Sequence, residues 1–166
     1  MWVKNIKKLG LISCVFCILN SMSCGYNVLK YKIDDNYTGP IVVFVYSDPK
    51  DAGDGNIVTI DKDGLGAVRS YQLNSKFTFV SAQTEKEIQI VSVGEEIEAS
   101  DKERGIFSLV KRSASSTCSP DSLSMIVFFV GVKSDFENWS KSGLNELKYF
   151  EEEGIDWCNF YKSHLK

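Results

Sequence analysis

MIVFFVGV, residues 125–132, is the most apolar stretch of the chain after its N-terminal leader. Its β-branched and aromatic residues favour a strand. It also lacks polar alternation, which is typical of a strand that is buried on both faces. IVVFVY, residues 41–46, has the same character. The two runs predict two central strands of one β-structure.

Further strand candidates surround these two runs at short intervals. Leu29, Tyr31 and Ile33 alternate with lysines, which is the period of a strand with one buried face. The segment 61–64 (DKDG) has turn composition, and we expect it to close a hairpin between its flanking strands. Short strands at this spacing predict a mainly β fold, an antiparallel β-sandwich of about 7–9 strands. The remaining candidates are 57–60, 65–69, 76–80, 87–93 and 106–110, and the serine-rich segment 111–124 is predicted to be a loop.

The period of the sequence changes after Val132. Leu144, Leu147 and Phe150 are spaced as one face of an amphipathic helix that ends near Gly154. Trp157, Phe160 and Tyr161 repeat at helical spacing in a second short segment. We therefore expect one or two short C-terminal helices, with their aromatic face packed onto the sheet.

The first 23 residues have the organisation of an export signal. Lys4, Lys7 and Lys8 precede an apolar run, Leu9–Leu19, and small residues follow it. The run is well short of the ~20 residues that a membrane-spanning helix needs. We predict a signal peptide over residues 1–23.

The end of this leader resembles the lipobox of bacterial lipoproteins. Ser21-Met22-Ser23-Cys24-Gly25 is similar to that motif, although the motif usually has Leu where this chain has Ser21. The resemblance implies lipid attachment at Cys24, a tether over residues 24–27 and a single domain over 28–166. It also implies an exported protein, lipid-anchored in the cell envelope to a bacterial membrane (outer membrane or periplasmic face). The alternative is an ordinary secretory signal whose cleavage leaves an unmodified Cys24.

The charge of the chain excludes several kinds of partner. The whole chain carries 19 Lys and Arg against 22 Asp and Glu, and loss of the three leader lysines leaves 16 against 22, a formal net charge near −6. An acidic protein without a basic run lacks the electrostatic footprint of a nucleic-acid binder. It also lacks a polybasic patch for anionic lipid. The expected membrane contact is therefore the N-terminal lipid.

The cysteines divide into two groups. Cys14 and Cys17 lie in the leader, and Cys24 is the predicted lipid site. Cys118 and Cys158 remain, in an oxidising compartment where disulfides persist. We predict a Cys118–Cys158 disulfide, and the alternative is two buried free thiols.

Three short segments of the domain resemble a family of small secreted or lipid-anchored bacterial domains of unknown function. The counterpart of its Tyr–apolar–Pro–x–x–Tyr–x–Gly motif is Tyr31–Pro40, which runs into the strand at 41–46. Ile60–Gly64 is similar to its Ile-Pro-x-x-Gly turn, and Phe128–Gly131 to its Phe-Phe-Val-Gly strand end. Asp34 and Asp61 replace the two prolines. The family carries no assigned activity, so the resemblance implies no catalytic residue.

The sequence contains no convincing catalytic set. His164, the only histidine, lies two residues from the C-terminus, and the zinc-type clusters of Cys and His are absent. Asp61 and Asp63, together with the loop 48–56, are weak calcium candidates, because aspartate-rich loops form parts of calcium sites. The acids between Glu95 and Glu103 indicate a solvated edge or loop. We predict no cofactor.

The leading functional hypothesis is a non-enzymatic binding or structural module of the envelope, with an envelope protein or glycan as its partner. It rests on the anchor and the fold class together with the lack of a catalytic set. Two alternatives stay open. One is a small carboxylate-dependent hydrolase of envelope glycans, which needs two acids converging in a cleft. The other is an immunity or inhibitor protein, with which the acidic charge and small size are compatible.

Overall fold

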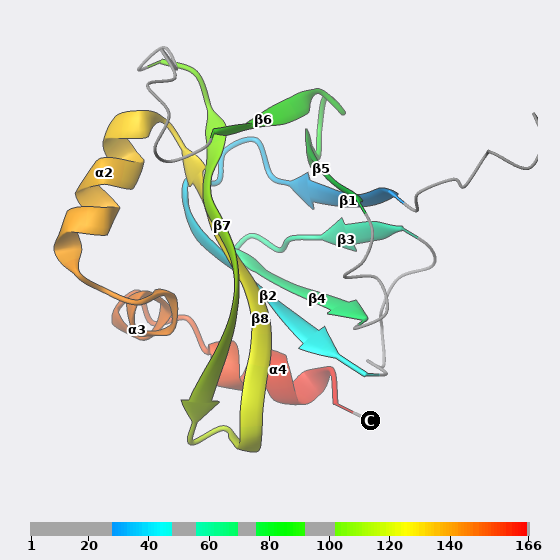
Figure 1. Cartoon of the computed structure of the whole chain (residues 1–166), viewed down its shortest axis with the longest axis vertical. Coiled ribbons are helices and arrows are strands. Elements are labelled where there is room, and N and C mark those ends of the chain that lie inside the picture. The colour runs from blue at the N-terminus through cyan, green and yellow to red at the C-terminus, as the bar shows by residue number, and fades with distance from the viewer. Residues whose placement is uncertain (1–27, 48–55, 70–75, 92–101, 166) are drawn as a thin grey trace, which may run out of the picture.

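Strands β8 (Ser119–Gly131) and β2 (Gly39–Tyr46) pair antiparallel inside one eight-stranded sheet (Figure 1). The computed structural model describes residues 28–47, 56–69, 76–91 and 102–165. Both strands have a neighbour on each side, so the prediction that the two apolar runs form central strands is confirmed.

The other six strands complete a mainly β fold, as predicted. The order in the sheet is β3-β1-β5-β6-β7-β8-β2-β4. The sheet is nearly closed, because its two ends approach each other: a Cβ on Gly66 of β4 would lie only 2.8 Å from Ile60, just after β3. These strands are β1 (Val28–Ile33), β3 (Ile57–Thr59), β4 (Leu65–Arg69), β5 (Lys76–Ser81), β6 (Glu87–Val91) and β7 (Gly105–Ser116).

An inner core fills the space between the two facing halves of the sheet. Its aromatic centre joins Tyr31 of β1, Phe79 of β5 and Phe128 of β8, with ring centroids 4.9–5.9 Å apart. Ile41 and Val43 of β2 belong to the same cluster and are fully buried. Every second residue of the apolar runs therefore points inward.

An outer core covers the opposite face of β2 and β8. Val42, Phe44 and Tyr46 of β2 pack there against two C-terminal helices, α3 (Glu146–Glu152) and α4 (Trp157–Ser163). Phe44 lies 5.4 Å from Tyr161 and 6.1 Å from Trp157, measured between ring centroids. Burial on both faces is the reason why 41–46 is apolar without interruption.

A further helix, α2 (Lys133–Ser142), follows β8 directly and packs beside the β7–β8 pair (Figure 1). Phe136 stacks on Phe107 of β7 at 5.0 Å, and Trp139 stacks on Phe129 of β8 at 5.4 Å. The remaining surface of the helix is polar, and none of its residues is fully buried. No helix in the described part of the chain is long and apolar enough to cross a membrane.

The sheet is mixed, so the prediction of a purely antiparallel sandwich is wrong in this respect. The turn at 61–64 does not close a hairpin: β3 pairs with β1, β4 pairs with β2, and both pairs are parallel. The chain passes from one half of the sheet to the other between β1 and β2, and again between β3 and β4. Both passages run in the same direction, so β3 lies parallel to β1 and β4 lies parallel to β2.

Two further expectations need correction. The described C-terminal part of the chain has three short helices instead of one or two, because α2 buries little apolar surface and leaves a weak periodic pattern. The segment 111–124 is a β-ribbon and not a loop, since β7 and β8 pair from Val110 and Val127 out to Ser116 and Ser119. Most of its serines, Ser113, Ser115, Ser122 and Ser124, stay exposed while the backbone pairs.

The first testable prediction concerns Gly64, where the two crossings touch. Gly64 has φ +82°, and a Cβ there would lie 2.0 Å from the Tyr37 hydroxyl and 2.9 Å from the Pro40 carbonyl oxygen. Gly64→Ala should therefore lower the free energy of unfolding in urea by about 3 kcal/mol, through backbone strain and collision together.

Gly143→Ala is the matched control, because Gly143 has φ +69° but nothing within 4 Å of the added Cβ. It should lower the free energy of unfolding by only about 1 kcal/mol, from backbone strain alone. Equal losses in the two variants would show that the Tyr37 contact does not constrain this turn.

Candidate binding groove

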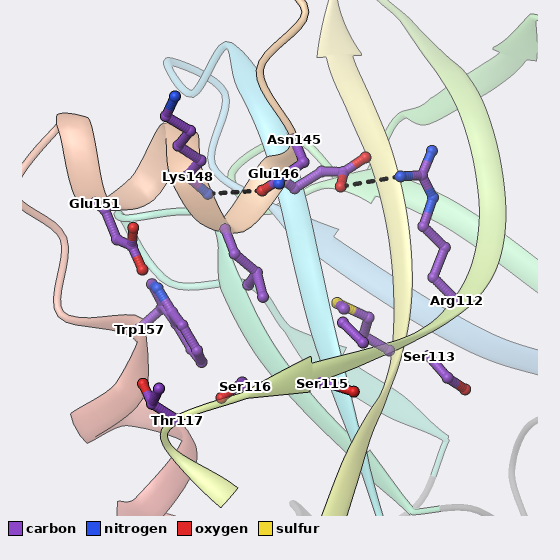
Figure 2. Close-up of a pocket in the computed structure, with 13 residues that line it drawn as sticks. Arg112, Ser113, Ser115, Ser116, Thr117, Asn145, Glu146, Lys148, Glu151 and Trp157 are labelled. Carbon is purple, nitrogen blue, oxygen red and sulfur yellow. Dashed lines mark hydrogen bonds and ion pairs between the residues drawn. The ribbon is translucent and has the colours of Figure 1, made fainter.

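A groove of about 510 Å³ lies between strand β7 and helices α3 and α4 (Figure 2). One wall is a run of six consecutive residues, Arg112–Thr117, from β7 and the turn after it. The other wall comes from the start of α3, residues 145–148, with Glu151 and Trp157. Met125 of β8 also lines the groove, which therefore extends over the outer face of the β7–β8 ribbon.

A second cavity of about 300 Å³ continues the first toward α2. The two share Arg112, Asn145 and Glu146. The second cavity reaches back along β7 to Ser108 and is walled by α2 and by the segment that joins it to α3. We call the two cavities together the β7 groove.

Strand β7 is irregular next to the groove. The described residues of β6 pair with β7 from Gly105 to Phe107, and residues 92–101, which follow β6, lie outside the described part of the chain. At Ser108, φ is +55°, and the register of β7 against β8 shifts before pairing resumes at Val110. Such a bulge bends a strand and increases its twist.

An ion pair crosses the groove at the boundary of the two cavities. Arg112 Nη1 donates to Glu146 Oε2 at 3.3 Å (Figure 2). The Glu146 side chain is only 6% exposed, whereas that of Arg112 is 48% exposed. Glu146 is the first residue of α3, where the helix dipole favours a negative charge. Arg112 therefore keeps donor capacity toward solvent while it neutralises a buried carboxylate.

The α2 end of the groove contains a polar atom without a partner. Trp139 lines the smaller cavity, and its Nε1 is buried with no hydrogen-bond acceptor in the described part of the chain. A buried indole N–H normally finds an acceptor.

A disulfide fixes the opposite end of the groove. Cys118, in the turn between β7 and β8, is bonded to Cys158 of α4, with the two Cα atoms 5.7 Å apart. These are the two cysteines predicted to pair. Their neighbours Thr117 and Trp157 line the groove on opposite walls. The bridge therefore holds the tip of the β7–β8 ribbon at a set distance from the helices.

The calcium candidates Asp61 and Asp63 lie away from the groove, in the turn between β3 and β4. Asp61 Oδ1 accepts from the backbone N–H groups of Asp63 and Leu65, at 2.9 and 2.8 Å. Asp63 accepts from Lys62 Nζ at 2.8 Å. Burial raises the pKa of Asp61, and the two backbone hydrogen bonds lower it in part. Both carboxylates therefore form their hydrogen bonds within the turn.

Calcium binding at this turn stays a prediction. Among the described residues, no group of three or more His, Cys, Asp or Glu side chains is placed to hold a metal ion. Residues 48–55, the second candidate loop, lie outside the described residues.

Other predicted features also fall outside the described residues. They include Cys24, the leader and most of the acidic segment between Glu95 and Glu103. His164 caps the end of α4 and is not among the residues that line the groove, so the serines of the groove have no histidine beside them.

The residues that shape the groove were missed from the sequence. Arg112 lies in a segment expected to be a loop, and its partner Glu146 lies 34 residues further on. Neither residue belongs to a recognisable motif. One signal could have identified β7 as a strand. The apolar run at 125–130 needs a partner strand on each side, and residues 111–116 are the segment that precedes it in the chain.

Comparisons with known proteins give no family for this chain. No family model matches it, and no curated protein matches it. A solved structure from Bacillus anthracis, of a protein provisionally described as a lipoprotein, aligns over 63% of this chain and 69% of that one. The identity is 13% and the TM-score 0.33. At that level the similarity carries no argument about fold or function.

The disulfide generates the second testable prediction. Replacement of both cysteines by alanine, Cys118→Ala with Cys158→Ala, should lower the free energy of unfolding by about 3–4 kcal/mol. In the chain-entropy model this is the effect of opening a loop of 40 residues. Urea unfolding with and without reductant measures it. Reductant should lower the urea midpoint of the unaltered protein and leave that of the double variant unchanged. If reductant changes the midpoint of neither protein, the prediction is contradicted.

The third prediction concerns Asp61. Asp61→Ala removes the acceptor of two backbone N–H groups and should lower the free energy of unfolding by about 1–2 kcal/mol. Asp61→Asn keeps a carbonyl acceptor and should preserve the turn. Because the pKa of Asp61 is raised from 3.8 in the folded protein, its ionisation opposes folding. Below pH 3.8, protonated Asp61 contributes to the stability of the folded protein. This contribution is lost as the pH rises from 3.8 through the raised pKa of Asp61.

The Asn variant should therefore gain stability relative to the unaltered protein as the pH is raised from 3 to 7. Urea unfolding at the two pH values measures the difference, and a constant difference would contradict the prediction. Calorimetric titration with millimolar calcium, on the unaltered protein and on Asp61→Asn, decides the calcium hypothesis.

Proposed function

We propose that this chain is a lipid-anchored, non-enzymatic binding protein of the bacterial envelope, and that the β7 groove is where its partner binds. The observation that carries the proposal is the groove itself, in which the half-exposed Arg112 of β7 pairs with the buried Glu146 of α3. A concave site with a few convergent polar groups is the default candidate for a binding site.

The place of the groove in the fold fits an anchored protein. With Cys24 acylated, only residues 25–27 separate the lipid from Val28, so the start of β1 would lie within about 14 Å of the lipid attachment. β1 and β3 begin on the right of Figure 1, and α2, α3 and the adjacent edge of β7 lie on the left. The groove would then face away from the membrane, where a partner can reach it.

Binding is favoured over catalysis by the composition of the groove. Its serines and Thr117 have no histidine beside them to activate a hydroxyl. The buried acid, Glu146, is engaged by Arg112. No observation in the groove favours a hydrolase or an inhibitor.

The fourth prediction tests the anchor. Cys24→Ala should move the protein from the membrane fraction to the soluble fraction of cells that process lipoproteins, because the acyl chains are its only strong attachment. Cys14→Ala is the matched control, since it removes a leader cysteine and should leave the protein in the membrane fraction. A Cys24→Ala protein that stays in the membrane fraction would refute lipid anchoring at this residue.

The same cells test the binding site. A photo-reactive amino acid in place of Ser115, in the groove, should give discrete cross-linked adducts with an envelope component. The same probe at Lys86, an exposed residue in the turn between β5 and β6, should not. Identical adduct patterns at the two positions would show that the groove is not the binding surface.

A further inference from the structure

We infer that the β7 groove binds a neutral carbohydrate chain. This inference rests on the proposed binding function and specifies the class of partner. The first support is the balance of charge in the larger cavity, whose walls carry Arg112 and Lys148 against Glu146 and Glu151. Because these charges cancel, a strongly charged ligand gains little net attraction there. A neutral polar ligand can form hydrogen bonds with groups of either sign.

The ion pair in the groove presents a donor next to an acceptor. Arg112 Nη1 and Glu146 Oε2 lie 3.3 Å apart, and the Arg112 side chain is about half exposed (Figure 2). A guanidinium can donate further hydrogen bonds and a carboxylate can accept further ones beyond the bond that joins them. Two hydroxyls on neighbouring carbons of a sugar ring match this pair, since one can accept from Arg112 while the other donates to Glu146. Both hydrogen bonds would involve a charged group, which makes them stronger than bonds between neutral groups.

The β7 wall of the larger cavity is rich in hydroxyl side chains. They belong to Ser113, Ser115, Ser116 and Thr117. Ser116 Oγ accepts from the backbone N–H of Cys118 at 2.9 Å and keeps its own proton to donate. A hydroxyl can both donate and accept, so this wall can match the hydroxyls of a sugar in either role.

The base of the larger cavity is apolar. Met125 and Trp157 line it, and as members of the outer core they are only 4% and 6% exposed. A sugar ring has the complementary form, because its C–H groups make an apolar face while its hydroxyls point outward to the polar walls. The cavity therefore suits a ligand that is apolar on one face and polar around its rim.

A protein partner is disfavoured by the same composition. Protein interfaces depend on a few large side chains that are buried at the contact. The exposed large apolar side chains in the described part of the chain are Val28, Ile57, Ile90 and Leu165, and none of them lines either cavity. The groove thus offers hydrogen bonds where a protein segment would need apolar contacts.

The two cavities together suit a chain of sugars better than a single unit. The larger cavity, about 510 Å³, already has the size of a small-molecule pocket, roughly 300–1,000 Å³. The smaller cavity continues it toward α2 and shares Arg112, Asn145 and Glu146 with it. We therefore expect affinity to rise with the number of sugar units until both cavities are occupied.

The fifth prediction tests this with an array of immobilised oligosaccharides, neutral and acidic and of increasing length, probed with the full chain purified in detergent. Neutral oligosaccharides should bind, the longer ones more tightly than the shorter ones. In calorimetric titration, their dissociation constant should change less than about twofold between low and high salt, because salt screens only interactions between charges. An array on which no neutral oligosaccharide binds, or binding of acidic ones alone with a strong salt dependence, overturns the inference.

A double variant tests the ion pair. Arg112→Met with Glu146→Gln removes both charges together, so that no buried charge is left without its partner. Affinity for the selected oligosaccharide should fall about tenfold or more, since hydrogen bonds to charged groups are lost. Glu137→Gln with Lys141→Met is the matched control, because this pair lies on α2 and lines neither cavity. Equal affinities of the two double variants overturn the inference.

A second variant leaves the buried carboxylate intact. Ser115→Trp places a large side chain in the wall of the larger cavity, at an exposed position, and should abolish binding of the oligosaccharide with the thermal midpoint of unfolding unchanged. Retention of binding in this variant shows that the oligosaccharide lies elsewhere and overturns the inference.

The cross-link from Ser115 separates this inference from the proposed function. Mass spectrometry of the cross-linked fragment identifies what is attached to it. Sugar residues support the carbohydrate partner. A fragment that carries a peptide overturns the carbohydrate partner and leaves the proposed binding function standing, whereas failure of the cross-link removes the proposed function itself.

Discussion

Burial of β2 and β8 on both faces is the constraint on which the rest of this structure depends. Phe128 and Ile41 are sealed by β1 and β5 on one side, while Phe44 and Val127 are sealed by the helices on the other. Either layer alone would leave half of these side chains in water, at roughly 1.5–3 kcal/mol for each large apolar group. The short helices α3 and α4 are therefore part of the core, although they are only seven residues long.

The position of those helices decides what β7 can do. They dock over β2 and β8, and the disulfide holds α4 against the tip of the β7–β8 ribbon. The ribbon is thus held along β8 and at its end. Glu146 lies where helix and ribbon approach each other, and its pairing with Arg112 avoids an isolated buried charge. A groove between the ribbon and the helices is the result.

The sequence predicted well those features that depend on burial of contiguous apolar residues. The runs at 41–46 and 125–132 identified the central strands, and the stripe around Trp157 identified a helix that packs on them. The sequence failed where pairing partners decide the outcome. DKDG at 61–64 is compatible both with a hairpin and with a crossing between sheet halves, because the same Asp61 hydrogen bonds close either turn. The groove could not be predicted for a related reason: Arg112 of β7 and Glu146 of α3 are 34 residues apart in the sequence and come together only because the helices pack on the sheet.

Strand β7 has features that proteins use to limit association through strand edges. Charged residues and bulges discourage such association, and β7 combines Lys111 and Arg112 with the bulge at Ser108. Arg112 also neutralises the buried Glu146, so one side chain both charges the surface of the ribbon and stabilises the start of α3.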